Sequence, residues 1–137
     1  MPYEIEDTPS GPVATVRASS REELFADAVA ATLAAAYAGV PPAGKYDGQV
    51  VPIQAAGDDD DALLSELLND CLEAVRTAPG TLHPPRWMAF DEKRVTANLP
   101  LTMPKTATRP VSLHGAGIER PLPSLVARVT LELSETH

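Results

Sequence analysis

Four consecutive aspartates, Asp58 to Asp61, follow Gly57 and form the densest group of potential metal ligands in the chain. A calcium loop of the EF-hand type needs ligands at alternating positions, a central glycine and a terminal glutamate, and this run lacks that spacing. Aspartates directly before an apolar helical pattern are typical of helix N-termini, where carboxylates accept backbone N–H bonds and offset the helix dipole. We therefore expect these aspartates to begin a helix, with calcium binding as the alternative.

A single histidine, His114, stands at the end of an apolar run and directly before Gly115. Histidine is the side chain that exchanges protons near neutral pH, so such a residue can carry chemistry, although a lone strand histidine is more often packed or solvated. The segment Gly115-Ala116-Gly117 that follows has neither the spacing nor the following helix of a phosphate-binding loop. His114 is therefore a candidate functional residue without an assigned ligand.

The sequence offers little support for an enzyme in its own right. Its one cysteine, Cys71, occupies an apolar position of a helical pattern, which indicates a buried thiol and leaves no partner for a disulfide within the chain. No serine–histidine–aspartate arrangement can be assembled from the sequence, and paired histidine and cysteine ligands at zinc spacing are missing from it. We expect a non-catalytic protein.

Composition sets the class of protein and of partner. The chain has 137 residues and 44% hydrophobic residues, which predicts one globular domain over residues 1–137. Its net charge of −8 argues against strong direct binding of nucleic acid and is compatible with a basic protein partner or a cation. No apolar run reaches membrane-spanning length and the acidic start does not resemble a signal peptide, so we expect a cytoplasmic protein.

Two segments have helical periodicity. Ser20 and Glu23 form a capping box before a segment whose apolar residues recur at helical spacing as far as Tyr37. A second helix is predicted after the aspartate run, with an apolar stripe from Leu63 to Val75. Alternating apolar patterns predict the strands, at residues 3–6, 13–18, 49–55, 86–90, 95–101, 108–114 and 125–133. The order predicts an α+β domain in which two amphipathic helices pack beside a predominantly antiparallel sheet.

The same order, with several local matches, resembles the archeases, which are small accessory proteins of RNA ligation. The second helix region resembles a family pattern of Gly-Asp-Asp followed by paired leucines, and Val111 to Gly115 is similar to the family's Val-Thr-Tyr-His-Gly. The matching segments are Tyr3 to Asp7, Arg21 to Ala28, Gly57 to Asn69, Val111 to Gly115 and Ala127 to Glu132.

The resemblance implies a protein that assists an RtcB-type tRNA-splicing ligase by promoting its guanylation and turnover. It also implies a divalent cation, calcium or magnesium, held by carboxylates of the opening motif and of the closing strand. The family opening reads Asp-His-Thr-Ala-Asp, whereas residues 7 to 11 read Asp-Thr-Pro-Ser-Gly. The resemblance therefore carries over two metal ligands, Asp7 and Glu132, and places Gly11 where the family has its second aspartate.

The resemblance also suggests a working surface around His114. Arg109 falls where the family carries a lysine, so a basic group that can contact a phosphate or an acidic partner is retained near the histidine. Two other hypotheses stand beside ligase assistance. The chain can be a divergent interaction module that has lost metal binding and serves another protein, or a small enzyme of a type that the sequence does not identify.

Overall fold

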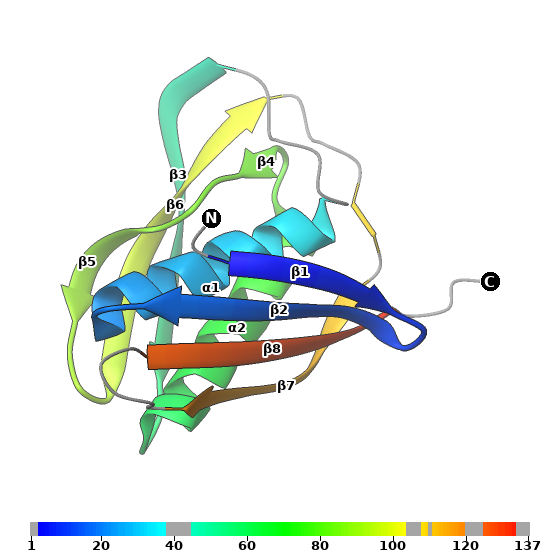
Figure 1. Ribbon diagram of the computed structural model, residues 1–137. Coiled ribbons are helices and arrows are strands. Elements are labelled where there is room, and N and C mark those ends of the chain that lie inside the picture. Colours follow the sequence, from blue (N-terminus) through cyan, green and yellow to red (C-terminus); the bar gives the residue numbers. More distant parts are fainter. Residues whose placement is uncertain (1–2, 38–44, 104–107, 110, 120–124, 134–137) are drawn as a thin grey trace.

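The computed structural model describes residues 3–37, 45–103, 108–109, 111–119 and 125–133 (Figure 1). Within these ranges the chain forms two helices and a set of antiparallel strands, which confirms the predicted α+β class. The elements are β1 (Tyr3–Thr8), β2 (Gly11–Ala18), α1 (Arg21–Ala36), β3 (Lys45–Ala56), α2 (Asp60–Thr77), β4 (Thr81–Leu82), β5 (Arg86–Phe90), β6 (Arg94–Met103), β7 (Val111–Glu119) and β8 (Leu125–Leu133).

The strands form two sheets rather than one. Sheet A has the order β1-β2-β8-β7, and sheet B has the order β3-β6-β4 with β5 also paired to β6. The first helix packs against β2, β8 and β1, whereas the second packs against β7 of sheet A and β3 of sheet B. The first helix also reaches sheet B, where the ring of Phe25 contacts that of Phe90 in β5. The two helices therefore lie between the sheets, and sheet A covers them on one side (Figure 1).

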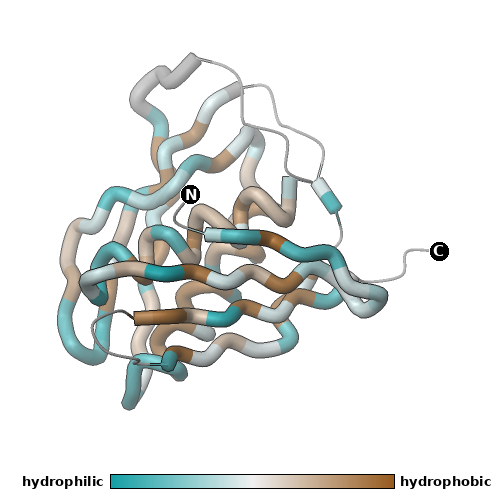
Figure 2. The backbone as a smooth tube through the Cα atoms, viewed as in Figure 1, coloured by the Kyte–Doolittle hydropathy of each residue, from teal (hydrophilic) through white to brown (hydrophobic). Residues whose placement is uncertain are grey.

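Hydrophobic and hydrophilic residues alternate along the strands of sheet A (Figure 2), and their burial distinguishes a core face from an outer face. In β2 the residues Ala14 and Val16 are buried, and their register partners Val129 and Ala127 in β8 are buried as well. The intervening residues, such as Arg17 and Arg128, are exposed. Because strand side chains alternate with a period of two, a residue of β1, β2 or β8 can be assigned to one face by its position.

The first helix begins where the capping box predicts and is buried on most sides. The Ser20 side chain accepts the N–H of Glu23, as an N-cap residue does. Alanines and leucines fill its contacts with both layers, and the Tyr37 hydroxyl accepts the N–H of Leu82 from β4. A helix surrounded by protein needs apolar residues all round, so the expected amphipathic stripe is wider here than a surface helix requires.

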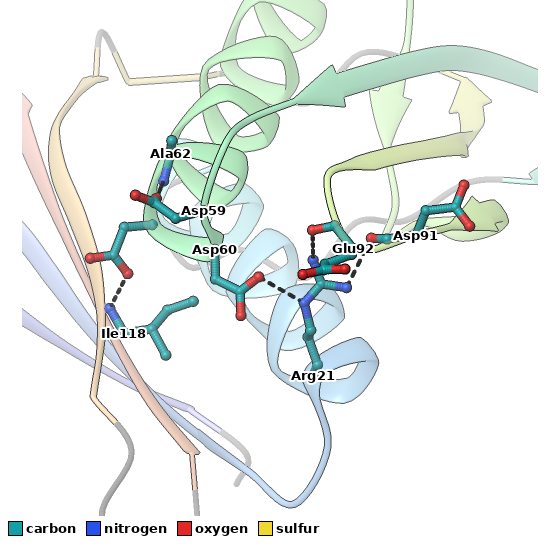
Figure 3. Close-up of polar contacts among 8 residues, drawn as sticks. Arg21, Asp59, Asp60, Ala62, Asp91, Glu92 and Ile118 are labelled. Atoms are coloured by element: carbon teal, nitrogen blue, oxygen red, sulfur yellow. Dashed lines mark hydrogen bonds and ion pairs between the residues drawn. The ribbon is translucent and has the colours of Figure 1, made fainter.

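The aspartate run begins the second helix, in agreement with the N-cap interpretation. Asp59 is the N-cap residue and its side chain accepts the N–H of Ala62 at 2.8 Å. Asp60 and Asp61 occupy the first turn, where negative charge is favourable. Asp61 accepts the N–H of Ile118 at 3.0 Å, which ties the start of α2 to the edge of β7 (Figure 3).

Arg21 connects three segments at the N-terminal ends of the helices (Figure 3). Its Nε donates to Asp60 Oδ1 at 2.9 Å, and its two terminal nitrogens donate to the carbonyl oxygens of Asp91 and Glu92 at 3.0 and 2.7 Å. The guanidinium also lies over the rings of Phe25 and Phe90. A planar group with several donors is needed for this combination of contacts, and a lysine cannot reproduce it.

We predict that Arg21→Lys lowers the free energy of unfolding by about 1–2 kcal/mol, because most of the charge-assisted hydrogen bonds are lost while the charge remains. Arg17→Lys is the matched control, since Arg17 is exposed and makes no hydrogen bond or ion pair with a described residue, and its effect should stay within about 0.5 kcal/mol. Urea unfolding curves measure both values. Equal effects of the two substitutions would contradict the structural role of Arg21.

Candidate functional site

The turn between β1 and β2 lies against the C-terminal end of β8 (Figure 1). Gly11 has a φ of 141°, and a Cβ atom added to it would lie 2.3 Å from the carbonyl oxygen of Leu131 and 3.1 Å from the Cα of Glu132. The Thr8 hydroxyl donates to the Gly11 carbonyl at 2.6 Å and closes the turn. The opening motif and the closing strand therefore meet, and they meet at a position where only glycine fits.

Asp7 and Glu132 are near this contact but lie on opposite faces of sheet A. Asp7 has the same parity as Ile5, which packs against the core, and Ile5 pairs with Ala14 on the core face. Glu132 follows the fully buried Leu131, so its side chain lies on the outer face. Strand alternation thus separates the two predicted metal ligands across the thickness of the sheet.

Arg109 holds the C-terminal end of α1. Its backbone N–H donates to the carbonyl of Ala36 at 2.8 Å and its Nε donates to the carbonyl of Ala35 at 3.1 Å. The last turn of α1 contains no basic residue of its own, so Arg109 supplies the positive charge that the helix dipole favours there. Its Nη1 also lies 3.8 Å from Oδ1 of Asp7, whose side chain is 78% exposed.

His114 contacts Glu132 on the outer face of the sheet. The distance from Nδ1 of His114 to Oε1 of Glu132 is 2.6 Å. The His114 side chain is 62% exposed and the Glu132 side chain is 50% exposed. The register of β7 and β8 shifts between Leu113 and Gly115, so His114 is the extra residue of a bulge. Bulges redirect side chains at the edges of sheets, and this one turns the histidine toward the carboxylate that the resemblance offers as a metal ligand.

The described residues do not fit a divalent cation at the predicted position. A hard cation needs several oxygens that converge on one point. Asp7 faces Arg109, Glu132 faces His114, and Gly11 has no side chain. No group of three or more histidine, cysteine, aspartate or glutamate side chains suited to a metal ion occurs among the residues that the structure describes.

The remaining candidate groups are structural. Burial raises the pKa of the Cys71 thiol to about 12, which keeps it protonated and unreactive at neutral pH. Burial lowers the pKa of His83, whose Nε2 lies 2.7 Å from the Thr102 hydroxyl. Cys71 belongs to α2 and His83 follows β4, so neither residue is part of sheet A. The site therefore consists of two side-chain pairs, Asp7–Arg109 and His114–Glu132, one on each face of that sheet. No helix in the described ranges is long and apolar enough to cross a membrane.

The fold as a whole matches solved structures. An archease and possible chaperone from Thermotoga maritima matches with a TM-score of 0.62 over 93% of this chain and 94% of its own, at 11% sequence identity. A protein from Methanobacterium thermoautotrophicum matches with a TM-score of 0.55 over 96% of this chain and 99% of its own, at 17% identity. No protein-family model and no curated protein matches the sequence. The chain therefore has an archease fold with a divergent sequence.

We predict that restoring the family's aspartate by Gly11→Asp destabilises the protein and does not create a metal site. The new side chain would clash with β8 and adopt an unfavourable φ, at a cost of about 1–3 kcal/mol. Gly117→Ala is the control, because a Cβ there has no atom within 4 Å. Thermal unfolding with and without calcium measures both variants. A calcium-dependent gain in the stability of Gly11→Asp would contradict the prediction.

Proposed function

We propose that this chain is a non-catalytic accessory protein that promotes the guanylation and turnover of an RtcB-type RNA ligase. Two observations support the proposal. The archease fold extends over almost the whole chain, and the segments that resemble the family occur in the family's order.

The surface proposed for this role is the end of sheet A around the β1–β2 turn. Asp7 and Arg109 lie on the helix side of the sheet, and His114 and Glu132 lie on the outer side. The side chains of His114 and Glu132 are 62% and 50% exposed, so a partner can reach this pair directly. A histidine held by a carboxylate can donate a hydrogen bond or carry a positive charge toward an anionic group of the partner.

The proposal does not depend on a cation bound by this chain. The residues that the resemblance offers as ligands lie beside Arg109 and His114, at 3.8 and 2.6 Å, and face opposite sides of the sheet. We propose instead that the two side-chain pairs, Asp7–Arg109 and His114–Glu132, maintain the shape and charge of the proposed surface. Assistance of the ligase would then depend on these four side chains.

A second candidate is an interaction module for a different protein partner. Gly11 favours it, because the position of the family's second aspartate has been closed by the contact with β8. The two candidates share the fold and the surface and differ only in the partner. An effect of the chain on guanylation of the ligase distinguishes the two candidates.

We predict that the chain increases the yield of covalently guanylated ligase when the two proteins are mixed with GTP and Mg²⁺, and that His114→Ala loses most of this effect. Transfer of radiolabelled GMP to the ligase is the measurement. Glu4→Gln is the control, since Glu4 is an exposed strand residue of β1, at the other edge of sheet A. If the wild-type chain leaves ligase guanylation unchanged, the ligase is not its partner and the interaction-module candidate replaces the proposal.

A further inference from the structure

The edge strand β7 carries unsatisfied backbone groups. In sheet A it pairs only with β8. The N–H of Ile118 donates to Asp61 rather than to β8, so it points away from the sheet. Because N–H and C=O directions alternate along an antiparallel strand, the N–H and C=O of Ala116 point outward as well. No described residue forms a hydrogen bond with these two groups of Ala116.

A hollow lies beside this edge on the outer face of the sheet. Gly115 and Gly117 pair with Thr130 and Arg128 of β8, and a Cβ atom added to either glycine would have no neighbour within 4 Å. The hollow has a volume of about 310 Å³ and is also lined by Asp61, Glu119 and Val126. Glycines within a strand often mark a place where another backbone or a ligand approaches closely.

Charged side chains of opposite sign lie toward the two ends of the hollow. Arg128 is exposed and forms no ion pair with any described residue. Asp61 and Glu119 lie toward the other end, where the N–H of Ile118 is already bonded. An occupant that matches this order has a negative group next to Gly117 and a positive group beyond Ile118.

We propose that β7 binds an extended segment of a partner protein as an added strand of sheet A, in the mode of β-strand addition. The segment hydrogen-bonds to the N–H and C=O of Ala116. Its acidic side chain lies over Gly117 and contacts Arg128. Because Asp61 takes the N–H of Ile118, the strand pairing ends before that residue, and the segment's basic side chain, two residues after the acidic one, reaches Asp61 and Glu119 from beyond the paired stretch.

The glycines make the contact with Arg128 possible. Neighbouring strands are about 4.8 Å apart, so an added strand lies about 10 Å from β8. A side chain at residue 117 would occupy the space between them. With glycine there, the long arginine and a carboxylate can meet above β7, whereas a valine would block them.

A second copy of the chain does not supply such a segment from sheet A. On the outer face β1 carries Glu4 and Glu6, and β7 carries Gly115, Gly117 and Glu119. Neither edge strand places an acidic and a basic residue two positions apart on that face. We assign the occupant to another protein, and a second copy of the chain is an outcome that the tests below distinguish. The inference is independent of the ligase proposal, since it rests on residues outside the two charge pairs.

The test uses the full-length chain and a synthetic peptide, acetyl-Thr-Val-Glu-Val-Lys-Val-Thr-amide, followed by ¹⁵N-resolved NMR. We expect saturable shifts of the amide signals of Ala116 and Gly117, and about three- to fivefold weaker binding when glutamine replaces the peptide's glutamate. Arg128→Gln should weaken binding by the same factor. Arg17→Gln, which removes an arginine from the same face on β2, should leave it unchanged. No shift at millimolar peptide, or equal losses in the two arginine variants, would overturn the proposal.

Gly117→Val provides a second test that does not depend on charge. The substitution has open space around it and should fold with unchanged or higher thermal stability, because valine favours strands. We expect at least about threefold weaker peptide binding from the loss of the arginine contact. Unchanged affinity in the folded variant would overturn the role of the hollow. Shifts of β7 signals with protein concentration alone would assign the edge to a second copy and overturn the proposal as well.

Discussion

The contact of the β1–β2 turn with β8 is the constraint on which the candidate site depends. Gly11 adopts a φ of 141° and brings the turn against the backbone of Leu131 and Glu132. This contact places the opening motif beside the closing strand, and it leaves no room for a side chain at the position between them. The same contact therefore accounts for the closeness of the opening motif to the closing strand and for the lack of a carboxylate at Gly11.

Strand alternation then decides what the neighbouring charges can do. Asp7 is on the core side of sheet A, where Arg109 holds the end of α1. Glu132 is on the outer side, where a bulge brings His114 to 2.6 Å from its carboxylate. Asp7 lies 3.8 Å from the Arg109 guanidinium and Glu132 lies 2.6 Å from the His114 ring, so each carboxylate has its own side-chain partner. The surface accordingly carries one such pair on each face of the sheet.

Much of this architecture can be predicted from the sequence because it is encoded locally. The N-cap at Ser20, the aspartates before α2 and the alternating strands depend on residues that are neighbours in the sequence, and the structure confirms them. The Glu23 carboxylate accepts from the Ser19 hydroxyl, so the second half of the capping box takes a different form. The fold class and its likeness to archeases follow from the order of these elements. The strand predicted at 108–114 extends instead from Val111 to Glu119, because Gly115 and Gly117 are tolerated on an open outer face.

The site was less predictable because its contacts are long-range. Arg109 can be assigned to the end of α1 only when the helix and the chain after β6 are seen together, although the lack of a basic residue in the last turn of α1 is a hint in the sequence. The faces of Asp7 and Glu132 depend on the register of β1, β2 and β8. Arg128 becomes a candidate binding residue only when its position opposite Gly117 of β7 is known.

The central claim is that Asp7 and Glu132 do not share a cation. Titration of the ¹⁵N-labelled chain with Mn²⁺, a paramagnetic substitute for calcium and magnesium, tests it most directly. The account predicts only weak broadening of the two residues, at Mn²⁺ concentrations comparable to those that broaden other exposed carboxylates. Joint broadening of both residues at substoichiometric Mn²⁺, reversed by excess calcium, would contradict it.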